Sequence, residues 1–82
     1  MFAKAVDYEE VKKAILEMVK KEGMMNMKEV FEGLEKRGFR ITTYTRAYIY
    51  GVIDGMKEQG LIREKVIGRA RVIIDKDFAK RD

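Results

Sequence analysis

The 82-residue chain contains no cysteine, histidine, serine, proline or tryptophan, and only one asparagine and one glutamine. Without cysteine there is no disulfide framework, and without histidine as well a metal site with nitrogen or sulfur ligands is excluded. Serine and cysteine nucleophiles and histidine acid–base catalysis are excluded on the same ground. Carboxylates remain, but nearly all fall where a solvated helix face predicts one. We therefore expect a protein that is not an enzyme and that has no catalytic residues, metal or cofactor.

Long hydrophobic runs are also missing. The longest stretch without a charge, residues 47–53, is far shorter than the roughly 20 apolar residues that a membrane-spanning helix needs. The first residues, MFAKAVDYEE, show neither the apolar segment nor the cleavage pattern of a signal peptide. We therefore expect a cytoplasmic protein without a membrane segment or an evident small-molecule ligand. Few Asn, Gln and Cys beside many Lys, Glu and Arg are typical of thermophilic proteins.

The composition is that of a globular protein, with 46% hydrophobic and 39% charged residues. A chain of this length buries only about 60–65% of the surface that its unfolded form exposes, so each helix must bury a full apolar face. The sequence contains no repeat, linker or low-complexity segment. Residues 1–82 therefore predict a single domain.

The net charge of +4 is concentrated in one part of the chain. Residues 1–39 and residues 74–82 each contain equal numbers of basic and acidic side chains, so residues 40–73 carry the whole excess. Arginine binds phosphate and base edges better than lysine does, and five of the seven arginines lie in this segment, which favours an anionic partner. Its basic residues are Arg40, Arg46, Lys57, Arg63, Lys65, Arg69 and Arg71, and its acidic residues are Asp54, Glu58 and Glu64.

The first helix is predicted over residues 7–22. Asp7 is placed as its N-cap, with Glu10 three residues later as in a capping box. Val6 and Val11 stand at the two positions of a hydrophobic staple. Apolar residues recur at helical spacing and predict the buried face as Val11, Ala14, Ile15, Met18 and Val19.

A second, shorter helix is predicted over residues 27–37. Asn26 is placed as its N-cap with Glu29 completing a capping box, and Gly38 follows the last turn. The predicted buried stripe is Met27, Val30, Phe31 and Leu34. The methionines at 24–25 are able to form a short strand that leads into this helix.

The third helix is predicted over residues 44–59, capped by Thr42 or Thr43. Its sequence is unusual, because ITTYTRAYIYGVIDG contains three threonines, three tyrosines and two glycines. The side chains expected on its core stripe are Thr45, Ile49, Val52, Ile53 and Met56.

Two glycines in the third helix, Gly51 and Gly55, call for a physical reason. An interior glycine costs about 1 kcal/mol relative to alanine. Close approach of another backbone would offset that cost. A neighbouring strand, a second subunit and a nucleic acid are the three candidates.

After the third helix the apolar period changes from 3.6 towards 2, which predicts a β-hairpin over residues 61–75. Two β-branched runs flank Gly68-Arg69, and Gly-X is typical of a type II′ turn. The apolar residues of the first strand do not alternate regularly, so the register is left open. Residues 76–82 form a tail in which we expect Phe78 to anchor onto the core.

This order of parts resembles the winged helix-turn-helix family of DNA-binding domains, an α+β fold of three helices and a C-terminal two-stranded wing. The resemblance spans residues 8–75. It is carried by MNMKEVFEGLEKRGFRITTYTRAYIYGVIDGMKEQGLI, a short helix, a turn and a longer helix, and by REKVIGRARVIID, the wing. MKEQGLI matches the usual ending of the family's recognition helix.

The resemblance implies that the third helix lies in the DNA major groove, with its N-terminal half nearest the bases. Arg46 would read guanine, Ala47 would approach a thymine methyl, and Arg69 at the wing tip would enter a minor groove or grip its phosphates. Threonine and tyrosine hydroxyls would meet phosphates. The implied DNA-binding residues are Arg40, Thr42, Thr43, Tyr44, Arg46, Ala47, Tyr50, Arg63, Lys65, Arg69 and Arg71.

Other interpretations stay open at the level of sequence. Winged helices also serve as protein-interaction modules, and RNA is a third partner class. Tyr48 suits core packing, and hairpin arginines also protect strand edges from aggregation. The resemblance implies a small transcriptional regulator or architectural protein that binds double-stranded DNA, as a homodimer through the first helix or the tail, because one such site binds weakly.

Overall fold

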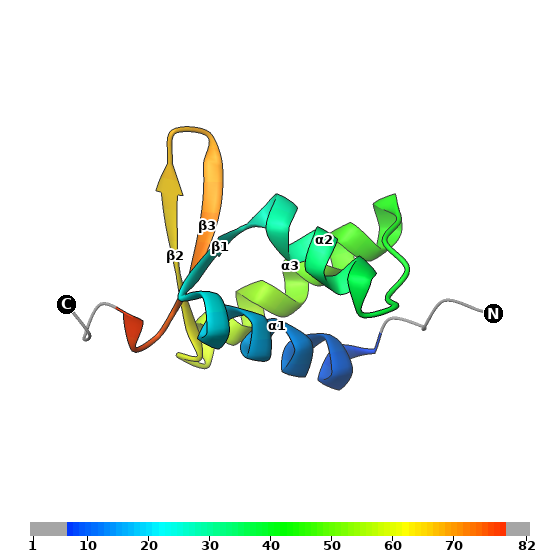
Figure 1. The fold of residues 1–82 in the computed structure, drawn as a ribbon, viewed down its shortest axis with the longest axis horizontal. Coiled ribbons are helices and arrows are strands. Elements are labelled where there is room, and N and C mark those ends of the chain that lie inside the picture. The colour runs from blue at the N-terminus through cyan, green and yellow to red at the C-terminus, as the bar shows by residue number, and fades with distance from the viewer. Residues whose placement is uncertain (1–6, 79–82) are drawn as a thin grey trace.

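The computed structural model of the chain describes residues 7–78, and within them three helices and three strands form one α+β unit (Figure 1). In chain order the elements are α1 (Tyr8–Glu22), β1 (Met24–Asn26), α2 (Met27–Lys36), α3 (Thr43–Glu58), β2 (Ile62–Ile67) and β3 (Ala70–Asp75). The predicted fold class, three helices followed by a C-terminal antiparallel hairpin, is confirmed. Val6, and with it the predicted hydrophobic staple, lies outside the described residues, as do residues 79–82 of the tail.

The first two helices begin where their capping residues predict. The backbone N–H of Glu10 donates to Asp7 Oδ2 at 3.3 Å. At the start of α2 the capping box is complete, since the N–H of Glu29 donates to Asn26 Oδ1 at 2.8 Å and Glu29 Oε1 accepts from the N–H of Asn26 at 3.0 Å. These bonds satisfy backbone donors that a helix start otherwise leaves without partners.

Helices α2 and α3 end in the same way. The N–H of Phe39 donates to the carbonyl of Leu34, and the N–H of Leu61 donates to the carbonyl of Met56, each at 3.0 Å. This six-residue closure is the Schellman motif, and in α3 it places Gly60 at a φ of 76°. Each chain reversal therefore turns an apolar residue back toward the core.

The core lies between the three helices and the inner face of the sheet. The buried stripe predicted for α1 is confirmed in full, and the stripes predicted for α2 and α3 are buried except for Phe31 and Thr45, which are half-buried. Ile62 and Ile73 contribute the sheet's part of the same cluster. Helical spacing thus identified the buried side chains, because in each helix the aliphatic residues recur along one face.

A three-stranded antiparallel sheet of order β1-β3-β2 joins the hairpin to the helices. The strand predicted at 24–25 is therefore confirmed, and it pairs Met24 with Ile74 and Met25 with Ile73. The N–H of Asp75 donates to the carbonyl of Gly23 at 2.8 Å and extends the pairing by one residue. The hairpin is thus fixed to the chain segment between α1 and α2.

The hairpin turn at Gly68-Arg69 pairs Ile67 with Ala70. Gly68 has a φ of 63° and is followed by a residue of negative φ, the pattern of the predicted type II′ turn. Figure 1 shows the hairpin extending well past the helices, and its outermost strand residues, Val66 and Ile67, are 63% and 52% exposed. The irregular apolar spacing of the first strand follows from this, because its second half leaves the core.

The tail turns back toward β1. Phe78 is half-buried, and a Cβ placed on Gly23 would lie 2.5 Å from its ring. Phe78 thus covers the link between α1 and β1, although it is not part of the core cluster itself. Among residues 7–78, no helix has the length and apolar character needed to cross a membrane.

The end of α3 yields a stability prediction. Substituting Gly60→Ala forces a side chain into the left-handed region and should lower the free energy of unfolding by roughly 1–2 kcal/mol. Gly51→Ala is the matched control, because Gly51 is helical and a Cβ there meets nothing within 4 Å. That control should raise stability by about 1 kcal/mol. Urea titrations of dilute protein measure the free energy of unfolding of both variants. An equal change in the two variants would contradict the left-handed role assigned to Gly60.

Candidate nucleic-acid interface

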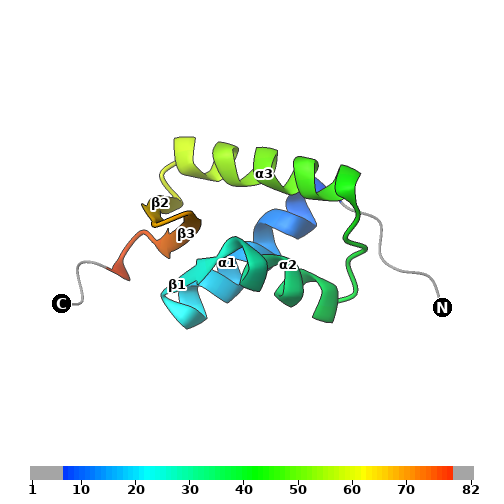
Figure 2. The same cartoon turned by 90° about the horizontal axis from the view of Figure 1, so that it is seen from above.

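Helix α3 runs along one side of the molecule, and no other described element covers its outer side (Figure 2). Thr42 is its N-cap, so the helix begins one residue earlier than predicted. The N–H of Thr42 donates to Thr45 Oγ1 at 2.6 Å, and the N–H of Thr45 donates to Thr42 Oγ1 at 3.2 Å. The Thr42 hydroxyl is therefore used inside the protein, whereas Thr43 and Tyr44 are exposed in the first turn.

Arg46 lies one turn further and stacks on an aromatic ring of α2. Its guanidinium carbon is 5.3 Å from the centroid of Phe31, and Phe31 meets Tyr50 edge-on, with centroids 5.7 Å apart and planes at 82°. Arg46 is exposed and has no carboxylate partner among residues 7–78. Because a guanidinium on an aromatic face keeps its in-plane donors available, Arg46 is held in place and remains able to bind an anion.

Arg71 has a different environment, because it is tied to α3 and to β2. Arg71 Nε donates to Glu64 Oε2 at 2.6 Å, its guanidinium lies 5.3 Å from the centroid of Tyr50, and its Nη2 is 3.8 Å from Asp54 Oδ1. Lys57 Nζ completes the cluster by donating to Glu64 Oε1 at 2.5 Å. We call these five residues, Tyr50, Asp54, Lys57, Glu64 and Arg71, the wing bridge.

The wing bridge changes the electrostatics of its members. The hydrogen bonds from Lys57 and then from Arg71 lower the pKa of Glu64, and the carboxylate of Glu64 raises the pKa of Arg71. Two of the basic residues in the positive segment, Lys57 and Arg71, are thereby neutralised internally. The exposed cations left in that segment are Arg40, Arg46, Arg63, Lys65 and Arg69.

The sheet divides the predicted wing contacts between two faces. Arg63 pairs with Ile74 and Lys65 with Val72, whereas Glu64 pairs with the core residue Ile73. Because successive side chains alternate across a strand, Arg63 and Lys65 point to the face opposite the one that carries Glu64 and Arg71. Arg69 lies in the exposed turn beyond both faces. The structure thus brings Arg46, Tyr50 and Arg71 together and places Arg63 and Lys65 elsewhere.

One flank of the exposed side of α3 carries small and aromatic residues without charge, beside the exposed Asp54 and Glu58. Tyr44 and Tyr48 are 89% and 42% exposed, and they share one flank with Gly51 and Gly55. A Cβ at Gly51 would meet no atom within 4 Å, and one at Gly55 would lie 3.6 Å from Tyr8 Oη, an ordinary contact. We call these four residues the tyrosine–glycine stripe. Of the three candidates for a close backbone, a neighbouring strand of the described chain is therefore excluded, and the core packing expected for Tyr48 is only partial.

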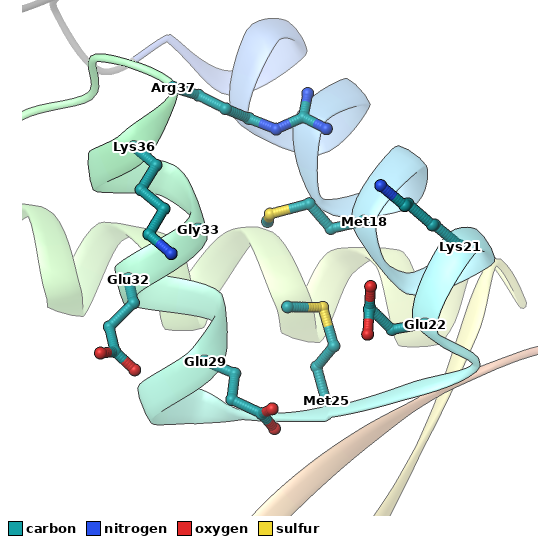
Figure 3. Close-up of a pocket in the computed structure, with 9 residues that line it drawn as sticks. All are labelled: Met18, Lys21, Glu22, Met25, Glu29, Glu32, Gly33, Lys36 and Arg37. Atoms are coloured by element: carbon teal, nitrogen blue, oxygen red, sulfur yellow. The ribbon is translucent and has the colours of Figure 1, made fainter.

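A hollow of about 490 Å³ opens between α1 and α2 (Figure 3). Met18 and Met25 point into it, and its rim carries Lys21, Glu22, Glu29, Glu32, Lys36 and Arg37. Glu29 is already used in the capping box, and Arg37 pairs with Glu17 at 3.2 Å. Because the rim mixes both signs of charge, the hollow selects neither an anion nor a cation. Within residues 7–78 no group of three or more acidic side chains is placed to hold a metal ion.

Sequence reasoning missed the roles of Phe31 and Glu64. Phe31 stood in the predicted buried stripe of α2, and nothing in its spacing indicated that Arg46 and Tyr50 would use its ring. The contact between Glu64 and Arg71, in contrast, was predictable from the sequence of the hairpin. A two-residue turn at Gly68-Arg69 fixes the register, and that register puts Glu64 diagonally across from Arg71 on one face.

The wing bridge predicts how stability depends on pH. The pKa of Glu64 is lowered on folding, so its ionised form stabilises the protein above its ordinary value of 4.5, and this contribution is lost as the pH falls below that value. Glu64→Gln should lower the free energy of unfolding by roughly 1–2 kcal/mol at neutral pH, and the difference from wild type should shrink steadily as the pH falls below 4.5 and the carboxylate becomes protonated.

Urea titrations across that pH range test this expectation. The control is Glu35→Gln, an exposed carboxylate of α2 that has no ion pair among residues 7–78 and that should change stability little at any pH. A Glu64→Gln protein as stable as wild type at neutral pH would mean that the bridge does not hold the wing.

Comparison of the chain with protein-family models, with curated proteins and with solved structures gives no match. The assignment of the fold therefore rests on the order α1-β1-α2-α3-β2-β3 and on the antiparallel hairpin that follows α3. That topology is consistent with a winged helix.

Proposed function

We propose that the protein binds double-stranded DNA through the N-terminal half of α3 and the wing tip, as a small transcriptional regulator. The observation that carries the proposal is Arg46, an exposed guanidinium held on Phe31 with no carboxylate partner in the described part of the chain. An arginine with no function in recognition gains little from this position, because a positive charge near a helix N-terminus opposes the helix dipole.

The shape of α3 supports the same proposal. A helix with its side chains is about 10–12 Å across, close to the width of about 12 Å of a major groove. Ala47 and Gly51 are exposed on α3, and their small size lets the helix axis approach the base edges. In this arrangement Arg46 reaches guanine O6 and N7, a contact worth roughly 1–3 kcal/mol of discrimination. Thr43 and Tyr44 are placed to donate to phosphates.

The wing supplies the second contact in the proposal. Arg69 is exposed in the turn that extends past the helices, where it meets a flanking minor groove or its phosphates. Arg40, in the connection before α3, adds a phosphate contact. Arg63 and Lys65 face away from α3. They attract DNA electrostatically from a distance, and they contact it directly only where the DNA curves around the sheet. Tyr50 and Arg71 serve to position the wing rather than to bind DNA.

A protein partner is the second candidate. It is favoured by the exposed apolar residues Val66 and Ile67 at the wing tip and by the nearly fully exposed Tyr44. Single exposed apolar side chains are common on soluble proteins, whereas five exposed cations that form no ion pair with any described residue favour a polyanion. DNA is therefore the better-supported partner.

Titration of a labelled duplex of about 30 base pairs at several salt concentrations tests the proposal. We expect a log–log salt slope of about −3 to −5 per bound protein, because each phosphate contact releases a counterion. Arg46→Ala and Arg69→Ala should each weaken binding about 5- to 30-fold, and each should reduce the slope by about 1 if its contact is to phosphate.

The matched control is Arg37→Ala, which removes the same charge from the end of α2 on the side of the α1–α2 hollow. It should weaken binding about twofold or less. If Arg37→Ala weakens binding as much as Arg46→Ala does, the affinity depends on net charge alone. The proposed DNA interface on α3 and the wing tip would then be wrong. If no duplex binds at low salt and high protein concentration, general DNA affinity is excluded, and the protein partner becomes the first candidate.

A further inference from the structure

The tyrosine–glycine stripe is not explained by anything inside the described chain. Gly51 and Gly55 each cost helix stability of about 1 kcal/mol relative to alanine, yet a Cβ at either position meets at most an ordinary contact. Tyr44 and Tyr48 expose large rings beside them. We propose that this stripe is the contact surface of a symmetric homodimer, in which α3 packs antiparallel against α3 of a second copy.

The order of residues in the stripe is self-complementary. A twofold axis that crosses the flank midway between positions 49 and 50 places Tyr44 over the partner's Gly55 and Tyr48 over the partner's Gly51. Both pairs have the same midpoint, so a single axis satisfies all four contacts at once, as a twofold interface requires. Tyr48 then lies on open helix backbone at Gly51, where a Cβ would meet nothing within 4 Å, and Tyr44 packs on Gly55 beside the Tyr8 hydroxyl, which lies 3.6 Å from the position of a Cβ there.

Charged residues at the two ends of α3 also favour antiparallel packing of the two α3 helices. Arg40 precedes the helix and Glu58 is its last residue, and both are exposed. Neither forms an ion pair within residues 7–78. Antiparallel packing brings Arg40 near the partner's Glu58, whereas parallel packing would place like charges together and tyrosine on tyrosine.

The size of the stripe sets the expected strength. A tyrosine side chain buries at most about 150–250 Å², so two from each copy with their neighbours give on the order of 1,000 Å² in total. Stable interfaces bury about 1,200–2,000 Å², and smaller ones are usually transient. We therefore expect a dimer that forms at tens to hundreds of micromolar protein.

This dimer differs from one that reads a palindrome. Packed helices lie about 8–10 Å apart, whereas two recognition helices in successive major grooves lie about 34 Å apart. The dimer buries Tyr44 and Gly51, which the proposed DNA contact also uses, so one α3 cannot make both contacts at once and the dimer competes with DNA binding. The inference does not rest on DNA binding, because the association is measured without DNA.

Sedimentation equilibrium from low to high micromolar protein tests the proposal. Wild type should shift from monomer to dimer over this range. Gly51→Ala and Gly51→Leu should weaken association at least tenfold, while Gly51→Ala raises the unfolding midpoint of dilute protein, so that loss of the dimer is not a failure to fold. Lys20→Leu, which adds the same side chain to an exposed position of α1, is the control and should associate as wild type does.

A charge reversal tests the antiparallel direction. Glu58→Arg should weaken association, and adding Arg40→Glu in the same chain should restore it. The proposal is overturned if wild type stays monomeric at hundreds of micromolar, if Gly51→Leu associates as tightly as wild type, or if the second reversal gives no recovery. Each of these outcomes leaves the duplex titration, and so the proposed function, to be decided separately.

Discussion

The pairing of three residues of β1 with β3 determines how the two halves of the protein fit together. β1 lies between α1 and α2, and β3 is the central strand, so its ladder joins the helical layer to the hairpin. The bond from the Asp75 N–H to the carbonyl of Gly23 lengthens this ladder, and Phe78 covers the same point. Residues about fifty positions apart along the chain are therefore direct neighbours in the sheet. Helix α3 is then placed by packing against the layer that this sheet completes.

On this frame the side chains of one surface form a continuous series from α2 to the wing. Arg46 and Tyr50 both use the ring of Phe31, Tyr50 meets Arg71, and Arg71 shares Glu64 with Lys57. The series separates cations with internal partners from cations without them. A map of basic residues alone would count Arg71 and Arg46 as equivalent, although Arg71 is close to two carboxylates and Arg46 forms no ion pair within residues 7–78.

The sequence predicted the fold better than the candidate site, for a physical reason. Helix starts depend on local chemistry, so Asp7 and Asn26 were recognised as caps, and helical spacing identified the buried stripes. The site depends on which side chains from distant elements meet. Arg63, Lys65 and Arg71 look alike along the chain, and only the register and the position of α3 separate the first two from the third. Phe31 lies near Arg46 because of the angle between α2 and α3, which no local pattern encodes.

The wing bridge also has a mechanical consequence. Glu64 and Arg71 are the outermost hairpin residues whose side chains contact α3. Nearer the tip, Val66 and Ile67 are largely exposed, and only their backbone pairing with Arg71 and Ala70 holds them in place. The projecting hairpin is thus held against α3 at its base by ionic contacts, whereas the core beneath it is held by apolar packing. Salt and acid weaken ionic contacts and leave apolar packing largely intact. Acid and salt should therefore loosen the wing while the apolar core persists, and the fold loses only the part of its stability that the wing bridge contributes.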